Sequence, residues 1–459
     1  MTKKLAVLMC LLLVLSAVAP ASIAAPKKVN VNVVLNQPFT REIESQLKSF
    51  GKVGNRIDAI NAFTMSIKAE DLPKLLALDF VEAANADAVR SVGPVSVQSA
   101  VTIANEGFST WNLDAINVTD PAVKGRTVLQ TGKGVYIAVL DTGLISYWRN
   151  FFPADQILTQ YAKSFGGGGS ANAAISEQPN KWEQDVNSHG THVTSTILGY
   201  SLNGDPIYGV APEAKVIPVK VLNQNGSGSS FVIAEAIVYV ANLKEELQVP
   251  MVINMSLGGS VLDAVEKAAV DYAVEKGVIL VAAAGNSGMG GMGYPAAYEP
   301  VISVAASGWT QEWLTGRYWW LGNVADPIDP MDFYIADFSS RDLFDDPDPL
   351  KDHDLDVAAP GSWIVGPYSV NQGSYGYYFL GGTSMACPHV AGAVALMLEK
   401  DASLTPSAAE DLLEMTAVPL GPGSRKIYGS NGVASEISWG LNATGHGLMD
   451  VTSLLQAVQ

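Results

Sequence analysis

The stretch GVYIAVLDTG, residues 134–143, ends an apolar run on an acidic side chain and a Thr-Gly turn. Such a run is typical of a strand in a parallel sheet that is covered on both faces. Similar runs follow at AKVIPVKVL (214–222), VPMVINMSL (249–257), GVILVAAA (277–284) and PVISVAAS (300–307), and helical stretches at 231–247 and 263–277 lie between them. From residue 111 onward, this alternation predicts an α/β domain with a doubly wound, mostly parallel sheet.

A different pattern fills residues 25–95. It reads as strand, helix, two strands, helix and strand, with the last strand at FVEAANADAV (80–89). This order predicts a small α+β domain of the ferredoxin-like, split β-α-β-β-α-β type. Residues 91–109 have the small and polar composition of a linker, so we expect a second domain over 96–459.

The first 24 residues have the layout of a secretory signal peptide. Lys3 and Lys4 precede an apolar run from Leu5 to Val18, and small residues follow up to Ala24. A membrane anchor is the alternative, but this run is shorter than the roughly 20 residues that span a bilayer. We therefore expect a secreted, extracellular protein without stable membrane insertion. Its only cysteine after the signal is Cys387, which excludes an intramolecular disulfide.

Composition limits the class of protein further. The 459 residues are 48% hydrophobic and 16% charged, which indicates a globular chain, and the net charge is −17. A surface this acidic repels nucleic acid and anionic membranes and favours cation binding.

Four polar residues stand at predicted strand ends or helix starts. Asp141 and Asn286 each follow a strand, His189 precedes a helical stretch in NSHGTHV, and Ser384 starts a helix in GGTSMACPHV. Singly, each is more often a turn, a cap or a structural residue. Together, they supply a nucleophile, a base, an orienting acid and an oxyanion donor at one edge of a parallel sheet.

The motifs DTG, HGTHV, SLGG, AAAGN and GTSMACPHV, in this order, closely resemble those of the subtilisin-like serine proteases. The resemblance runs from about residue 111 to the end. It implies that Ser384 attacks the scissile carbonyl, His189 accepts the serine proton and Asp141 holds the imidazole. The side chain of Asn286 and the backbone N–H of Ser384 would form the oxyanion hole.

The same resemblance implies a groove in which substrate binds as an added β-strand. Its two sides would be Ser256-Leu257-Gly258 and Gly226-Ser227-Gly228. The first pocket would lie between Leu257-Gly258, Ala283-Ala284-Gly285 and a floor near Gly293. These residues are small and uncharged, so we expect large apolar side chains before the cut.

Relatives of this family carry a propeptide, which implies that residues 25–95 are an intramolecular chaperone and inhibitor removed by self-cleavage between Ser91 and Ser109. A permanent binding domain is the alternative. The implied partners are polypeptide substrates and the chain's own propeptide, on a monomer. No cofactor is expected for catalysis.

Structural calcium is also expected from the resemblance. Asn203 and Asp205 lie where the family often has a calcium loop. Further candidates are Asp345, Asp346, Asp348, Asp352 and Asp354, in an acidic insertion at about 342–354 that reads equally well as a surface loop. A Trp-rich insertion at about 309–337 is expected to pack on the body rather than to form a substrate rim.

Two other functions fit less well. A catalytically silent relative would be expected to lack the serine or the histidine, but all four catalytic positions, including the oxyanion Asn286, are filled here. A lipase-type esterase places its serine in G-x-S-x-G and orders its triad differently.

Overall fold

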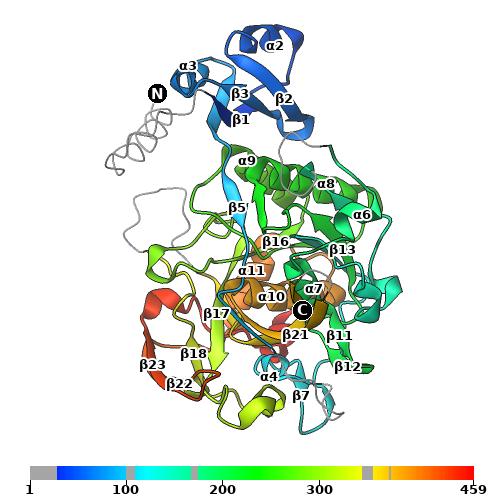
Figure 1. The fold of residues 1–459 in the computed structure, drawn as a ribbon, viewed down its shortest axis with the longest axis vertical. Coiled ribbons are helices and arrows are strands. Elements are labelled where there is room, and N and C mark those ends of the chain that lie inside the picture. Colours follow the sequence, from blue (N-terminus) through cyan, green and yellow to red (C-terminus); the bar gives the residue numbers. More distant parts are fainter. Residues whose placement is uncertain (1–27, 100–108, 167–173, 344–354, 372–373) are drawn as a thin grey trace.

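The computed structural model describes residues 28–99, 109–166, 174–343, 355–371 and 374–459. It consists of a small N-terminal unit, residues 29–86, and a larger body (Figure 1). A short strand, β5 (Val89–Ser91), runs from the unit down the face of the body. The predicted signal peptide lies outside the described residues.

The N-terminal unit is an antiparallel sheet of order β2-β3-β1-β4 with two helices. Its elements are β1 (Val29–Leu35), α2 (Arg41–Leu47), β2 (Gly51–Ile57), β3 (Ala62–Ile67), α3 (Leu72–Leu76) and β4 (Val81–Ala86). Along β1, Val31 and Val33 enter a core with the helices, while Asn32 and Val34 face the body. This is the α+β order that the sequence predicts.

One predicted strand is divided in the structure. FVEAANADAV was expected to form a single strand, but β4 ends at Ala86 and β5 pairs with β14 (Ser227–Ser229) of the body. The division occurs at Asp87, whose carboxylate accepts hydrogen bonds from the hydroxyls of Ser229 and Ser230. Within the expected linker, β6 (Ser96–Ser99) pairs with another strand of the body, β21 (Ser374–Gly381), and residues 100–108 lie outside the described part.

The body is built on an eight-stranded, mostly parallel sheet. Its order is β10 (Lys163–Ser164), β13 (Lys215–Lys220), β9 (Tyr136–Asp141), β15 (Met251–Met255), β16 (Ile279–Ala283), β17 (Ile302–Trp309) and β18 (Phe333–Ile335), with β19 (Val357–Pro360) also on β17. Only β18 is antiparallel to its described neighbour. The predicted subtilisin-like α/β fold is confirmed.

Residues of the sheet alternate between two cores. On β9, Ile137 and Val139 join one cluster, and Ala138 and Leu140 join the other. The first cluster includes α7 (His189–Leu198) and α10 (Thr383–Lys400), and the second includes α8 (Ser230–Leu247) and α9 (Ala264–Glu275). Burial on both faces explains why the strands read as continuous apolar runs.

Smaller elements surround this frame. They are α4 (Trp111–Asp114), β7 (Thr119–Asp120), β8 (Gly125–Arg126), α6 (Pro179–Trp182), α11 (Pro406–Thr416), α12 (Val451–Ala457) and the hairpins β11–β12 (Gly199–Leu202, Asp205–Tyr208), β20–β21 (Ile364–Asn371, Ser374–Gly381) and β22–β23 (Gly423–Tyr428, Ala434–Trp439). In the Trp-rich insertion, Trp309, Trp319 and Trp320 are buried, and Trp309 stacks on Trp111 with ring centroids 6.2 Å apart. The insertion therefore packs on the body, as expected. Within the described ranges, no helix is long and apolar enough to cross a membrane.

Candidate active site

A buried acid and a buried imidazole meet where β9 ends and α7 begins. Nδ1 of His189 lies 2.9 Å from both carboxylate oxygens of Asp141, and Thr142 N–H donates to Asp141 Oδ1 at 2.7 Å. Gly190 permits the approach, because a Cβ there would lie 2.5 Å from the carbonyl oxygen of Gly143. Since Nδ1 donates to Asp141, Nε2 is the nitrogen that is left to accept a proton.

Ser384 is the second residue of α10. Its hydroxyl donates to the carbonyl of Ser256 at 3.0 Å, and the Ser256 hydroxyl donates to the carbonyl of Ser384 at 2.9 Å. Within the part of the chain that the structure describes, buried Nε2 of His189 has no hydrogen-bond partner. The Ser384 hydroxyl is thus held by Ser256, and Nε2 of His189 is left to accept a proton.

The amide of Asn286, just beyond β16, has a fixed orientation. Its Oδ1 accepts hydrogen bonds from the backbone N–H and the hydroxyl of Thr383, both at 2.9 Å. The NH₂ group is therefore left as a donor beside the start of α10, where Nδ2 lies 3.6 Å from the Cβ position of Gly382. Next to the N-terminus of a long helix, such a donor suits developing negative charge.

The groove beside these residues holds the chain's own segment 89–95. Ser91 pairs with Gly258 in both directions, its N–H donating at 3.0 Å and its carbonyl accepting at 3.2 Å. Val92 N–H donates to the carbonyl of Gly226 at 2.8 Å, and β5 lies antiparallel to Ser227 and Gly228. The segment then crosses to Gly381, whose carbonyl accepts from Val95 N–H at 2.7 Å. Gly258 on one side and Gly226, Ser227 and Gly228 on the other thus pair with this segment as an added strand.

Comparison with known proteins agrees with this geometry. The model described as the subtilase family, peptidase S8, matches residues 132–440. The chain belongs to the subtilase family. It is by family a hydrolase of the subtilisin-like serine endopeptidases.

Individual relatives match in sequence and in structure. Subtilisin Savinase from Lederbergia lenta is 34% identical over 326 residues, which cover 71% of this chain and 97% of the relative. Subtilisin from Bacillus sp. strain TA39 is 34% identical over 291 residues, which cover 62% of this chain and 60% of the relative. The structure of fervidolysin from Fervidobacterium pennivorans has the same fold. The match covers 95% of this chain and 62% of the fervidolysin chain, with a TM-score of 0.66 and 24% identity.

In this subtilase, the residues predicted to line the first pocket lie close to one another. Gly293 N–H donates to the carbonyl of Ala284 at 2.9 Å, and Gly285 N–H donates to the hydroxyl of Thr383 at 3.2 Å. A Cβ on Gly293 would lie 3.2 Å from the carbonyl of Gly259, so this floor lies beside the Leu257-Gly258 wall. The remaining wall residue, Ala283, is the buried end of β16.

A buried lysine and a buried carboxyl both contact Thr142, the residue that follows Asp141. Lys220 is in register with Asp141, and its Nζ donates to the carbonyls of Thr142 and Leu222 at 2.6 and 2.7 Å. The Thr142 hydroxyl donates to Asp185 at 2.9 Å. Burial raises the pKa of Asp185 to about 7 and lowers the pKa of Lys220. The sequence did not reveal this pair, although the aligned ends of neighbouring strands were a signal for Lys220.

The other core histidines have structural surroundings. Nε2 of His192 lies 3.1 Å from the carbonyl of Ile364, and Nε2 of His389 lies 2.8 Å from Nδ2 of Asn112. Burial lowers their pKa values to about 3 and about 4, so both rings stay neutral. Burial also raises the pKa of the Cys387 thiol to about 12, which keeps it unreactive.

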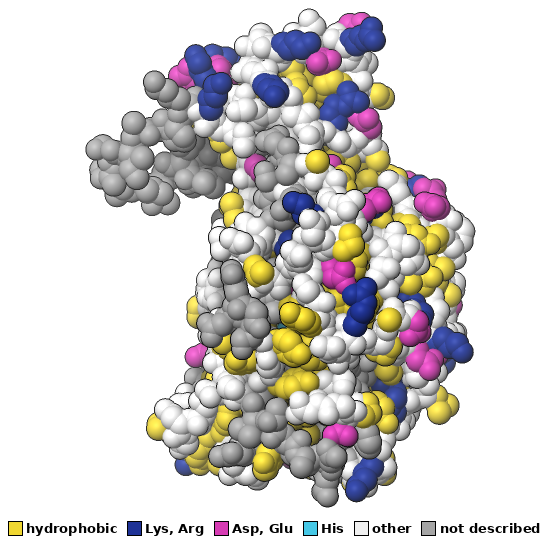
Figure 2. All heavy atoms as spheres, turned by 45° about the vertical axis from the view of Figure 1, so that its right-hand side comes forward, with side chains coloured by type: hydrophobic (Ala, Val, Ile, Leu, Met, Phe, Trp, Pro, Cys, Tyr) yellow, Lys and Arg dark blue, Asp and Glu magenta, His cyan; other side chains and the backbone are white. Residues whose placement is uncertain are grey.

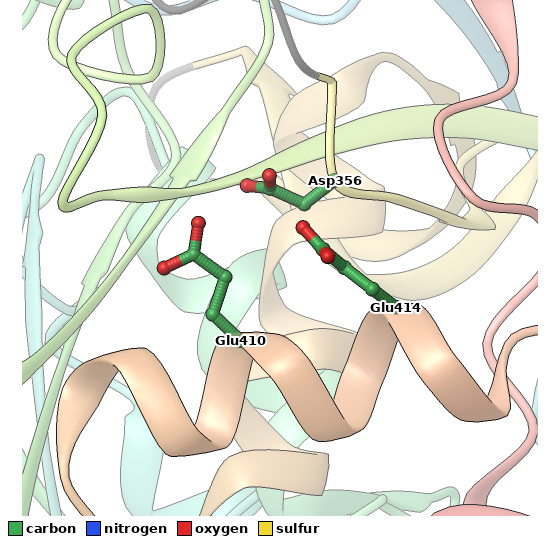
Figure 3. A group of neighbouring side chains, drawn as sticks. All are labelled: Asp356, Glu410 and Glu414. Atoms are coloured by element: carbon green, nitrogen blue, oxygen red, sulfur yellow. The ribbon is translucent and has the colours of Figure 1, made fainter.

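Few of the calcium candidates can be placed in the subtilase. Asn203 lies in the turn of hairpin β11–β12 and Asp205 begins β12, while Asp345, Asp346, Asp348, Asp352 and Asp354 lie outside the described residues. The carboxylates of Asp356, Glu410 and Glu414 gather with their ligand atoms within 4.8 Å of one another (Figure 3). Their oxygens suit a hard cation, but acidic side chains also gather without an ion, so no site is assigned to them.

Proposed function

We propose that the protein is a secreted serine endopeptidase made as a self-processing proenzyme. Residues 1–24 are its export signal, 25–95 its propeptide and 96–459 its catalytic domain. The observation that carries this proposal is the position of residues 89–95, which lie as an added strand in the groove that leads to Ser384. An enzyme that holds its own chain in the place of substrate is both inhibited and set to cut itself.

The reaction follows from the donors and acceptors at the site. When substrate is in place, the Ser384 hydroxyl leaves the carbonyl of Ser256, donates to Nε2 of His189 and attacks the scissile carbonyl. Asp141 stabilises the imidazolium that forms. The tetrahedral oxyanion accepts hydrogen bonds from the Asn286 amide and from Ser384 N–H. His189 then gives its proton to the leaving amine, and a water molecule hydrolyses the acyl-enzyme by the reverse proton transfers.

Substrate recognition uses mainly backbone pairing. The strand bonds made by Ser91 and Val92 are available to any extended peptide. The pocket formed with Ala283, Ala284 and Gly293 is small-sided and uncharged, and we propose that it accepts a large apolar side chain before the cut. Polypeptides and the propeptide are thus the partners of a monomeric enzyme.

Further properties follow from the family. Catalysis needs no cofactor, and we propose that calcium stabilises the mature fold, which a fall in melting temperature on adding EGTA would test. Figure 2 shows charged side chains of both signs scattered over the described part of one face, without a single basic patch there. From the net charge of −17, we propose that nucleic acid is not among the partners.

The proposal is tested by expressing residues 25–459 with Ser384 intact or changed to Ala, with and without calcium. Intact-protein mass spectrometry should show that the parent loses about 70 residues and digests casein, whereas Ser384→Ala stays full length and inert. Ser435→Ala, at an exposed serine on β23, is the matched control and should behave as the parent. A folded parent that neither shortens nor digests casein would support a silent binding protein instead.

A further inference from the structure

A buried ion pair joins the tail in the groove to the body. Arg90 of β5 donates from Nε to both carboxylate oxygens of Glu266 on α9, at 3.1 Å each, and from Nη2 to Glu266 Oε2. The two side chains are 0% and 1% exposed. Within the described residues, Asp141 and His189 are the other ion pair that is buried to this degree.

The surroundings of this pair form a pocket for a planar cation. Nη2 of Arg90 also donates to the carbonyl of Val261 at 2.9 Å. Gly259 provides the space, because a Cβ there would lie 2.9 Å from Arg90 Nη1 and 2.4 Å from the carbonyl of Val89. The other charged groups that act on Arg90 are Asp263 and Asp87, and both favour its positive charge.

Loss of the cation would leave Glu266 in an unfavourable state. Burial raises the pKa of the Glu266 carboxyl, and the charge and hydrogen bonds of Arg90 act in the opposite direction. A buried carboxylate without its partner carries the full desolvation penalty. The pocket therefore favours a positive side chain over a neutral one of the same shape.

The strand register shows what this pocket holds when another chain fills the groove. Arg90 lies opposite Gly228, Ser91 pairs with Gly258, and Val92 N–H donates to Gly226 before the segment crosses toward Ser384. In an extended substrate of the same register, the residue at the position of Arg90 would place its side chain against Glu266. This residue is the fourth before the cut when the bond that follows the position of Gly93 is the one cleaved.

We infer that Glu266 is a specificity-determining residue, which selects an arginine at the substrate position that Arg90 occupies. The inference rests on the proposed proteolytic function and adds a charged subsite to the apolar first pocket. Arginine is preferred over lysine because its planar fork spans both the Glu266 carboxylate and the Val261 carbonyl. The propeptide uses the same pocket to hold its tail.

The test compares quenched fluorescent peptides containing Val-X-Ser-Val-Phe-Ala, where X is Arg, Lys, Leu or citrulline, the neutral isostere of arginine. With the mature enzyme, we expect kcat/KM for Arg to exceed that for citrulline by about 10- to 100-fold, since the carboxylate loses its charged partner. Mass spectrometry checks that the cut follows Phe. Peptides with one residue inserted between X and Phe should lose the preference, because X is then out of register.

A variant enzyme locates the effect on one side chain. Glu266→Gln should reduce the Arg-to-citrulline ratio to near one, whereas Glu275→Gln, at an exposed residue of the same helix, should keep it. If Glu266→Gln fails to mature, the comparison of peptides on the unchanged enzyme still decides. Equal cleavage of the Arg and citrulline peptides would overturn the inference, while failure to cut any peptide would overturn the proposed function instead.

Discussion

The body and the N-terminal unit bury their sheets differently. The central strands of the body lie between α7 and α10 on one face and α8 and α9 on the other. The sheet of the unit has its own helices on one face, and its other face meets α9. Val34, Ile57 and Ala62 of the unit belong to a hydrophobic cluster of the body rather than to the unit's own core.

This difference indicates which region depends on the other. Both cores of the body are built mainly from its own residues, whereas the unit completes one of its faces only by contact with the body. That contact is partly polar, since Asn32 donates to Asp263 at the start of α9, and Asp87, just after the unit, accepts from Ser229 and Ser230 at the start of α8. A small domain that borrows part of its burial is expected to be marginal when it is detached.

The largest expected difference concerns core truncation. Phe63→Ala in the unit and Phe165→Ala in the body each remove a buried ring and cost about 3–5 kcal/mol. In the Ser384→Ala background, we expect Phe63→Ala to unfold the unit, whereas Phe165→Ala leaves the body folded. Hydrogen exchange followed by mass spectrometry measures each region. Unchanged protection of β1 and β3 in Phe63→Ala would show that the unit is more stable than this comparison implies.

Loss of the Asn286 amide should slow two reactions, the hydrolysis of peptides and the release of the N-terminal unit. Asn286→Ala should reduce kcat on peptides about 10²–10³-fold, a magnitude established on subtilisin itself. It should slow the release of residues 25–95 by a similar factor, because the same oxyanion hole would serve both reactions. Time courses by mass spectrometry and fluorescence give the two rates. Release at the parental rate would mean that another protease removes the unit.

A smaller difference is expected in how the stability of the two regions depends on pH. Burial raises the pKa of Glu312 in the body to about 8, whereas the described carboxyls of the unit are at least partly exposed. The pKa of Glu312 is higher in the folded than in the unfolded chain. Its contribution to the free energy of unfolding is therefore complete below about pH 4.5 and is lost as the pH rises to about 8.

Glu312→Gln removes this titration. In the Ser384→Ala background, the change in the free energy of unfolding of the body between pH 6 and 9 should become smaller by about 2–3 kcal/mol. Urea titrations at each pH measure it, and Glu299→Gln, at an exposed residue, is the control. An unchanged pH dependence in Glu312→Gln would assign the titration to another buried group.

The smallest effect concerns the polar contact between the regions. Asp87→Ala removes the acceptor for Ser229, Ser230 and the backbone N–H of Phe231 at the start of α8. Loss of such a capping interaction costs about 1 kcal/mol, so the cleaved unit should inhibit peptide hydrolysis about five- to tenfold less tightly. Glu82→Ala, at an exposed residue of β4, should leave the inhibition constant unchanged. Equal inhibition by the Asp87 variant would show that apolar contact alone holds the unit.

Much of the fold was predictable because each pattern reports a local physical requirement. Continuous apolar runs such as 134–140 indicate strands covered on both faces, and the structure has β9 between two cores. The division of FVEAANADAV was not predictable in this way. Its alternation fits a strand throughout, and only the pairing of β5 with β14 shows that it serves two sheets.

The sequence by itself determined the fold class, the family and the positions of Asp141, His189, Asn286 and Ser384. These residues lie at strand ends and helix starts, and the carboxyl ends of parallel strands share one edge of a sheet. The tertiary structure alone decided that Lys220 and Asp185 both bond to Thr142 beside Asp141 and that Arg90 meets Glu266, 176 residues further along the chain. Periodicity shows which face of an element is buried, but a buried charge acquires its partner only when distant segments pack together.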